Sequence, residues 1–201
     1  MNKGILIVVS APSGSGKSTI LRRLLALRDN LRFSVSATTR APRAGEEHGR
    51  EYFFVTRDEF QAMVAADAFL EHAEFVENLY GTPRAAVEAQ LEQGFDVYLD
   101  IDVQGARQVK AKRPETLTVF ILPPSMEELE RRLTGRGTDD PETVRRRLSQ
   151  AERECAERVH FDYVIVNDEV ERAAAELSGI IDGYKARLAQ EADEAIQHDF
   201  L

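Results

Sequence analysis

The stretch Ala11-Pro12-Ser13-Gly14-Ser15-Gly16-Lys17-Ser18-Thr19 follows the apolar run Ile5-Leu6-Ile7-Val8-Val9 and precedes a helix-like stretch, Ile20 to Leu27. A buried strand, a glycine-rich turn and a helix in this order predict a phosphate-binding loop. Glycines let backbone N–H groups turn toward a polyphosphate at the positive end of a helix. The usual pattern G-x-x-x-x-G-K-[ST] has glycine where this chain has Ala11.

Side chains of this loop can act on the phosphates directly. Lys17 is placed to reach the β and γ phosphates, the Ser18 hydroxyl can bind Mg²⁺, and Thr19 can assist from the helix. The alternative is a turn that merely connects the strand to the helix. The strand and helix on either side favour phosphate binding.

The composition limits the kinds of function to consider. With 201 residues, of which 43% are hydrophobic, the chain can form one domain with insertions. A net charge of −9 disfavours broad binding to nucleic acids or anionic membranes. The single cysteine, Cys155, excludes an internal disulfide and a multi-cysteine metal site. No secretion leader or apolar run of membrane-spanning length is evident, so we expect a cytoplasmic protein.

Apolar, β-rich runs recur along the chain and are mostly separated by helical signals. This alternation predicts an α/β fold in which a parallel sheet carries helices on both faces. The predicted strands are Ile5–Ser10, Phe33–Ala37, Val97–Ile101, Leu117–Leu122 and Tyr163–Val166.

Local signals predict where several helices begin and end. Ser125 to Glu128 and Thr56 to Glu59 have the spacing of capping boxes. Thr82-Pro83 and Asp140-Pro141 each place an N-cap residue before proline, and Gly94 should end the helix that Pro83 begins.

Two segments interrupt the alternation and are expected to be insertions on a core of residues 1–37, 83–126 and 158–188. Segment 38–82 has β-like pieces at Tyr52–Val55 and Phe69–Phe75 around a small helix, and we interpret it as a substrate lobe. Segment 127–157 is helix, a break at Thr134–Thr138, and helix, which is typical of a mobile lid. The tail, 189–201, is expected to be exposed and frayed.

Acidic residues end one of the predicted core strands. Asp100 follows the run Val97-Tyr98-Leu99, and Asp102 comes two residues later. Ligands bind at the carboxyl ends of strands in open α/β sheets, so Asp100 is our candidate for ordering Mg²⁺ and its waters. Asp102 could face the acceptor instead. The alternative is two solvated acids in a turn.

A second candidate site is basic. Arg40, Arg43 and Tyr52 surround a loop that contains proline and glycine. Two arginines three residues apart can clamp a monophosphate, and a tyrosine hydroxyl can close the third side. Most charged loop residues are simply solvated, so this pattern alone leaves both interpretations open.

Taken together, eight motifs between Gly4 and about Asp182 resemble the guanylate kinase family. They are the phosphate loop, Ser36-Ala-Thr-Thr-Arg40-Ala-Pro-Arg43-Ala-Gly45-Glu, Gly49-Arg-Glu-Tyr52-Phe-Phe, Glu71-His-Ala-Glu, Asn78-Leu-Tyr80-Gly81-Thr82, Asp100-Ile-Asp-Val-Gln-Gly105, Gly135-Arg136-Gly137 and Ile165-Val166-Asn167-Asp168. Two positions depart from the family: Leu79 replaces a common aromatic residue, and Val103 a residue that is often larger.

The resemblance implies transfer of the γ-phosphoryl group of ATP, with Mg²⁺, to GMP, in purine nucleotide recycling and GTP and dGTP supply. It implies a phosphate-loop NTPase-type core with a five-stranded parallel sheet, a small mixed α/β lobe that binds GMP and a helical lid. ATP and GMP are the implied partners, with neither nucleic acid nor membrane, and the oligomeric state stays open.

The resemblance also implies roles for individual residues. The GMP phosphate would be held by Arg40, Arg43, Tyr52 and Tyr80, and guanine would be read by Ser36, Glu71, Thr82 and Asp102. ATP would be bound by residues 11–19, Arg132, Arg136 and Asn167, the last beside adenine. The catalytic residues would be Lys17, Arg40, Arg136 and Arg147, and the Mg²⁺ ligands Ser18 and Asp100. The alternative for Arg136 and Arg147 is that they are ordinary arginines on a helix surface.

The chemistry of guanine agrees with these roles. Its N1 and N2 donors match one ionised carboxylate such as Glu71, and its O6 acceptor suits a hydroxyl. AMP would leave a buried carboxylate unpaired, so the site can reject it. The alternative for Glu71 is a surface acid at a strand edge.

Two other functions remain as alternatives. A related phosphotransferase could act on a ribose bisphosphate, although the set Ser36, Glu71 and Thr82 argues against it. A protein-binding module of the same fold typically lacks a working phosphate loop, whereas this chain has Lys17, Ser18 and Asp100.

Overall fold

The computed structural model of the protein describes residues 3–134 and 141–198. Its strands are β1 (Leu6–Ser10), β2 (Leu31–Phe33), β3 (Ala37–Thr38), β4 (Phe53–Phe54), β5 (Phe69–Phe75), β6 (Asn78–Pro83), β7 (Asp96–Asp100), β8 (Leu117–Leu122) and β9 (Tyr163–Val166). Its helices are α1 (Lys17–Leu27), α2 (Arg57–Ala65), α3 (Arg84–Glu92), α4 (Val103–Lys112), α5 (Met126–Thr134), α6 (Pro141–Ala156), the 3-10 helix η1 (Glu157–His160) and α7 (Val170–His198).

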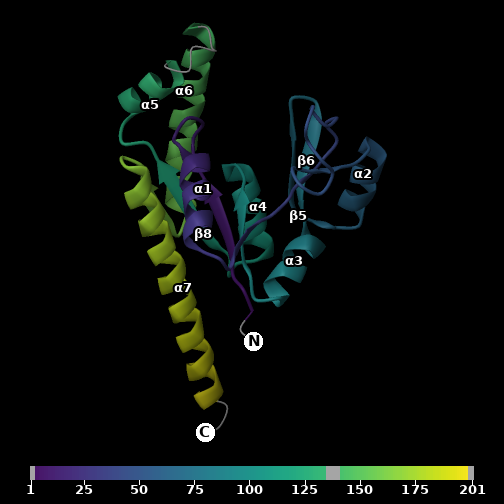
Figure 1. Ribbon diagram of the computed structural model, residues 1–201, viewed down its shortest axis with the longest axis vertical. Helices are drawn as coiled ribbons and strands as arrows, with labels where there is room; N and C mark the ends of the chain where they lie inside the picture. The colour runs from purple at the N-terminus through teal and green to yellow at the C-terminus, as the bar shows by residue number, and fades with distance from the viewer. Residues whose placement is uncertain (1–2, 135–140, 199–201) are drawn as a thin grey trace. The chain divides into compact units, whose positions relative to one another are not determined.

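The strands form a five-stranded sheet with the order β2-β7-β1-β8-β9 and a four-stranded sheet with the order β4-β3-β6-β5. In the first sheet β1 pairs with β7, β2 with β7 and β8 with β9, and each of these pairs is parallel. The predicted α/β fold, with a five-stranded parallel sheet flanked by helices, is confirmed (Figure 1). The strands predicted at 5–10, 97–101, 117–122 and 163–166 are each found within one residue of these bounds.

Contacts divide the chain into two compact units. Unit 1 comprises residues 1–10 and 30–118, and unit 2 comprises residues 11–29 and 119–201. The segment predicted to be a substrate lobe, 38–82, thus belongs to unit 1, whereas the phosphate loop and the segment predicted to be a lid, 127–157, belong to unit 2.

The prediction of one strand over Phe33–Ala37 is wrong, because this segment is shared between the two sheets. β2 begins at the buried Leu31 and ends at Phe33, and the N–H of Ser34 still donates to the carbonyl of Tyr98 in β7 (3.1 Å). The chain then leaves β7, and Ala37 begins β3, which pairs with β4 and β6.

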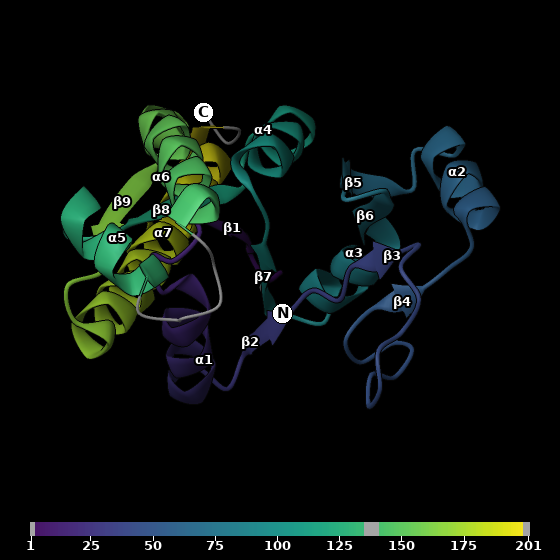
Figure 2. The same cartoon turned by 90° about the horizontal axis from the view of Figure 1, so that it is seen from above.

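The four-stranded sheet of unit 1 packs against α2 (Figure 2). Phe60 of α2 is buried and stacks on Phe69 of β5, with ring centroids 4.5 Å apart. α2 begins with the predicted capping box: the Thr56 hydroxyl accepts the N–H of Glu59 (3.2 Å), and the Glu59 carboxylate accepts the N–H of Thr56 (2.7 Å). This helix start is therefore confirmed.

Thr82 does not cap a helix, contrary to the prediction. β6 extends through Pro83, and α3 begins at Arg84 without a side-chain cap. The Thr82 hydroxyl donates instead to the carboxylate of Glu71 (2.6 Å), and this tertiary partner outweighs the local capping signal. Gly94 follows the helix in the left-handed conformation (φ 88°), as expected at a helix end.

In unit 2, α1 contacts α7, and a buried cluster joins α5 to α6. This cluster consists of Leu129, Leu133, Val144 and Ala151. α6 begins at Pro141 as predicted. The break was expected at Thr134–Thr138, but Thr134 is still the last residue of α5. Residues 135–138 and Asp140, the expected N-cap of α6, lie outside the described residues.

The predicted capping box at Ser125 forms in part. The Ser125 hydroxyl accepts the N–H of Glu128 (3.1 Å). The Glu128 carboxylate binds the guanidinium groups of Arg131 and Arg132 instead, each at 2.7 Å. These bonds lower the pKa of Glu128 to about 2.

The tail is exposed over residues 189–195, as expected. It is not frayed as far as His198, contrary to the expectation, because α7 continues to that residue (Figure 1). Pairs of side chains one turn apart support the helix. Nε of Arg187 lies 3.6 Å from Oε1 of Glu191, and the Gln190 amide donates to Oε1 of Glu194 (2.9 Å). Even so, none of the helices within 3–134 and 141–198 is long and apolar enough to cross a membrane.

Candidate functional site

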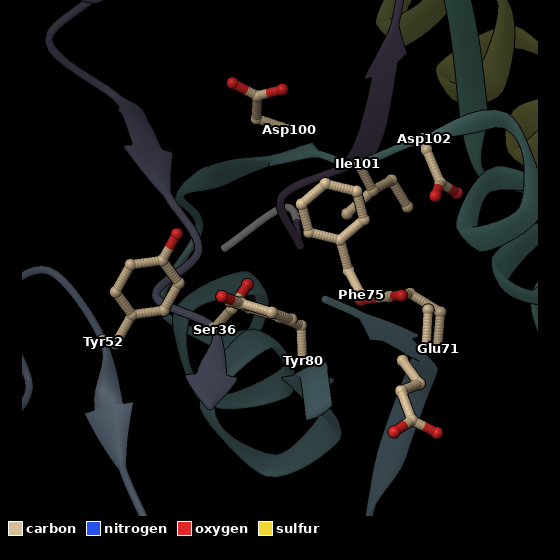
Figure 3. A pocket seen from close by; sticks show the side chains of 10 residues that line it. Ser36, Tyr52, Glu71, Phe75, Tyr80, Asp100, Ile101 and Asp102 are labelled. Carbon is tan, nitrogen blue, oxygen red and sulfur yellow. The ribbon is translucent and has the colours of Figure 1, made fainter. Parts of the chain in front are cut away.

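Unit 1 contains a cavity of about 360 Å³, which we call the Glu71 pocket. A volume of this order suits a small-molecule ligand. Its walls come from β5, β6, the start of the lobe and the segment after β7 (Figure 3). It is lined by Ser36, Tyr52, Glu71, Tyr80, Asp100 and Asp102, all predicted as site residues, and by Ala73, Glu74, Phe75 and Ile101.

Glu71 places a carboxylate in this pocket although its side chain is only 6% exposed. Burial raises the pKa of the carboxyl group, and hydrogen bonds from Thr82 oppose that rise. The Thr82 hydroxyl, itself 1% exposed, donates to Oε1 at 2.6 Å. One acceptor oxygen is thus satisfied by the protein, and a ligand with N–H donors can satisfy the other.

Asp100 and Asp102 lie at the carboxyl end of β7: Asp100 is the last residue of the strand, and Asp102 comes two residues later. Asp102 is the N-cap of α4, where its Oδ1 accepts the N–H of Gly105 (2.8 Å). Asp100 ends the strand and is exposed. The predicted location of these acids at a strand end is therefore confirmed, and both line the Glu71 pocket.

The tyrosines of the pocket lie close to Arg40. The rings of Tyr52 and Tyr80 meet edge to face with centroids 6.0 Å apart, and the Arg40 guanidinium lies 5.4 Å from the Tyr52 centroid. Arg40 Nη2 donates to both oxygens of Glu46 at 2.9 Å. The backbone N–H of Arg43 donates to the same carboxylate (2.7 Å), so Glu46 fixes the loop that carries both arginines. Arg40 lowers the pKa of Glu46.

Unit 2 contains a second cavity of about 360 Å³, which we call the loop pocket. It is lined by every residue from Ala11 to Thr19, together with Glu154 of α6. Gly14 and Gly16 both have left-handed backbone conformations, with φ of 91° and 92°. Residues with a Cβ atom rarely adopt this backbone conformation, which explains why glycine occupies these two positions.

Two side chains hold the loop from one side. The Asn167 amide donates to the carbonyl of Ser15 (2.7 Å), and Arg132 donates to the same oxygen (3.2 Å) and to the carbonyl of Asn167 (3.3 Å). In a trans peptide the carbonyl and the following N–H point in opposite directions, so the N–H of Gly16 points away from Asn167. This support orients a backbone donor as an anion site requires.

The loop is also packed closely against its neighbours. A Cβ atom at Gly16 would lie 2.3 Å from the Asn167 amide nitrogen, and one at Gly14 would lie 2.9 Å from a methyl group of Leu133. Arg147 donates to the Ser13 hydroxyl (3.2 Å). The contacts with Asn167 and Leu133 thus add a steric reason for glycine at both positions.

Four further residues singled out in the sequence are Asn167 and Arg136, expected to bind ATP, and the family departures Leu79 and Val103. Asn167 is buried against the loop, and its contact with adenine stays a prediction. Arg136 lies outside the described residues. The two departures from the family pattern, Leu79 and Val103, are 7% and 8% exposed and belong to the packed interior.

Sequence reasoning missed the apolar walls of the Glu71 pocket. Phe75 is 68% exposed and yet lines the cavity, together with Ile101 (Figure 3). The sequence contains a signal, because Glu71, Ala73 and Phe75 are spaced by two residues, as residues on one face of a strand are.

Comparison with known proteins agrees with this geometry. A family model described as guanylate kinase matches residues 3–184. The chain is 52% identical over 188 residues to the guanylate kinase of Alkalilimnicola ehrlichii, covering 94% of this chain and 93% of the relative. It is 48% identical to that of Escherichia coli strain K12, covering 100% and 97%.

A solved structure is also similar. The crystal structure of guanylate kinase from Anaplasma phagocytophilum has a TM-score of 0.70 and 38% sequence identity, over 90% of this chain and 86% of that one. The chain belongs to the guanylate kinase family.

Proposed function

We propose that the two pockets each bind one substrate of the family reaction, the ATP-dependent phosphorylation of GMP to GDP. The Glu71 pocket takes the acceptor GMP, and the loop pocket takes the phosphates of ATP. The buried Glu71 carboxylate, held by Thr82, is the observation that carries this proposal. In this division segment 38–82 is the GMP-binding lobe and segment 127–157 is the lid.

Guanine fits the donor and acceptor pattern of the Glu71 pocket. In our proposal Glu71 accepts N–H groups from N1 and N2, and Asp102 assists on the same edge. The Ser36 hydroxyl is available for O6, and Thr82 acts by holding Glu71. Phe75 and Ile101 supply apolar surface for the faces of the ring.

The GMP phosphate is proposed to bind on the side of the pocket that holds the tyrosines. Arg40 supplies a guanidinium that Glu46 holds in one orientation, and the hydroxyls of Tyr52 and Tyr80 add donors. Arg43 completes the cluster from the same loop.

ATP is proposed to bind through backbone N–H groups of residues 11–19, with Lys17 on the transferred phosphate. The hydroxyl of Ser18 and the carboxylate of Asp100 are oxygen donors of the kind that Mg²⁺ prefers, and both residues are exposed, as a hydrated ion requires. When bound with ATP, Mg²⁺ would neutralise charge on the phosphates.

Phosphoryl transfer requires the protein mainly to position the substrates and to neutralise negative charge. Lys17, Arg147 and the lid residue Arg136 are proposed to neutralise the charge that develops on the transferred group. Arg132 and Asn167 act on the loop itself through the Ser15 carbonyl. Excluding water while both substrates are bound would prevent hydrolysis of ATP.

The composition supports a cytoplasmic enzyme of purine nucleotide recycling and GTP and dGTP supply. The net charge of −9 speaks against nucleic acids and anionic membranes as partners. ATP and GMP are the proposed small-molecule substrates.

Replacing Glu71 by alanine tests the acceptor assignment. We expect the ratio of kcat/KM for GMP to that for AMP to fall by at least about tenfold, the equivalent of one hydrogen bond to a charged group. The KM for ATP should not change, because the loop pocket is built from other residues. An unchanged ratio would contradict the assignment of Glu71 to guanine.

A further inference from the structure

One face of α4 contacts β5 on both sides of Glu71. Gly105, Gln108 and Lys112 are spaced by three and four residues, so they share this face of the helix. β5 is an end strand of its sheet, and no strand within residues 3–134 and 141–198 pairs with its outer edge, so the peptide groups there need other partners. α4 supplies several of them.

Gln108 pairs with β5 as a peptide group would. Its Oε1 accepts the N–H of His72 (3.1 Å), and its Nε2 donates to the carbonyl of His72 (3.0 Å). Lys112 donates to the carbonyl of Phe69 (2.8 Å). The backbone is thereby held at the residue directly after Glu71 and at a residue two positions before it.

The ladder between β5 and β6 is irregular at this point. Phe69 pairs with Pro83 and His72 with Gly81, so the register shifts in between, where Glu71 lies. Such an irregularity changes the direction of a side chain and interrupts the ladder. The contacts from α4 therefore fix a part of the strand that its own sheet fixes incompletely.

Gly105 leaves room for the Glu71 carboxylate. A Cβ atom at this position would lie 3.0 Å from Oε2 and 3.4 Å from Cδ of Glu71. The N–H of Gly105 is meanwhile bound by Asp102, another residue of the pocket. The start of α4 thus touches Glu71 on the oxygen that Thr82 does not hold.

We propose that Gln108 and Gly105 are positioning residues for acceptor specificity: Gln108 fixes the strand that carries Glu71, and Gly105 keeps open the space that its carboxylate occupies. This inference rests on the proposed role of Glu71 in reading guanine. Neither residue needs to touch the nucleotide.

The test compares GMP with IMP, which lacks the 2-amino group but keeps N1–H and O6. The ratio of the two kcat/KM values reports how well the carboxylate is aligned with N2. In Gln108→Met, which keeps the length of the side chain and removes both hydrogen bonds, we expect this ratio to fall about tenfold. The KM for ATP should stay within about twofold of its original value.

Two further variants separate positioning from general damage. Gln104→Met makes the same change at an exposed position of the same helix and should leave the ratio unchanged. Gly105→Ala should lower the ratio, although alanine is the better helix former. Gly105→Ala also carries the test if Gln108→Met unfolds below the assay temperature.

The same substitutions are then made in a Glu71→Ala background. If Gln108 acts through Glu71, Gln108→Met has no further effect on the ratio there. An unchanged ratio in folded Gln108→Met and Gly105→Ala, or an equal fall in the Glu71→Ala background, would overturn the inference. If Glu71→Ala itself leaves the ratio unchanged, the proposed acceptor role fails, and this inference fails with it.

Discussion

Replacing Thr82 by valine removes one hydroxyl from the Glu71 pocket and nearly preserves the shape of the side chain. That hydroxyl donates to Glu71 at 2.6 Å, and both side chains are buried. A hydrogen bond to a charged group contributes about 1.5–3 kcal/mol. If the bond is needed for the ionised carboxylate to bind GMP, kcat/KM for GMP at neutral pH should fall by about tenfold or more.

The direction of the pH effect follows from the same bond. Burial raises the pKa of Glu71, and the hydrogen bonds from Thr82 oppose this rise. Without the hydroxyl the pKa rises further, so the acidic limb of the kcat/KM profile for GMP should move to higher pH. The GMP phosphate also titrates, with a second pKa of about 6, and this affects the kcat/KM profile. The effect is the same for the unaltered protein and for Thr82→Val.

The assay is coupled ADP release with GMP from pH 5 to 8, at saturating ATP. Thr82→Ser is the matched control, because it keeps the hydroxyl and should keep the limb in place. The reasoning would be refuted if Thr82→Val left the limb where it is or moved it to lower pH. A loss of the same size at every pH would also refute it.

Three further predictions follow from the two pockets. Glu71→Gln should raise the thermal midpoint of unfolding at pH 7.5, because the pKa of Glu71 is raised in the folded protein and folding therefore favours the neutral form of the side chain. Below the pKa of the unfolded chain, about 4.3, the carboxyl group is neutral in both states and the gain should vanish. Thermal melts at pH 4 and pH 7.5 check this. Asn167→Ala removes the 2.7 Å bond to Ser15 and should raise the KM for ATP about fivefold with the KM for GMP unchanged; steady-state kinetics with an unchanged KM for ATP would contradict the supporting role. Glu46→Gln loosens Arg40 and should raise the KM for GMP about threefold, and calorimetric titration showing tighter GMP binding would count against it.

Local patterns predicted the framework of the fold well. The run Ile5 to Ser10 and the loop that follows it have the apolar and glycine signals of a buried parallel strand and a phosphate-binding loop. The strand is found as β1, and Gly14 and Gly16 of the loop have left-handed conformations. Phosphate binding by the loop stays a prediction. These features depend on residues that are neighbours in the sequence, so a local pattern contains their physical cause.

Features that depend on distant partners were not predictable in this way. Thr82 has the sequence context of a helix cap, but its hydroxyl is used by Glu71 on the neighbouring strand. Gln108 lies 36 residues from His72, and no local pattern relates the two. Phe33–Ala37 alternates apolar and polar residues as a single strand would, but its two ends belong to different sheets.

The helical end of the chain was misjudged for a different reason. Residues from Gln190 onward lack an apolar stripe, which suggested a frayed tail. Their alanine and glutamate content favours helix without a core, and side-chain pairs such as Gln190 with Glu194 extend α7. Helix propensity outweighed the missing hydrophobic pattern there.

The most direct test of the two-pocket account is coupled ADP release with Mg-ATP against a panel of acceptors. The panel contains GMP, AMP, CMP, UMP, dTMP and ribose 1,5-bisphosphate, and each is assayed with the unaltered protein and with Lys17→Ala. The account predicts rapid turnover with GMP, weak or no turnover with the others, and loss of turnover in the variant. Turnover with the sugar phosphate in preference to GMP, or undiminished turnover by Lys17→Ala, would contradict it.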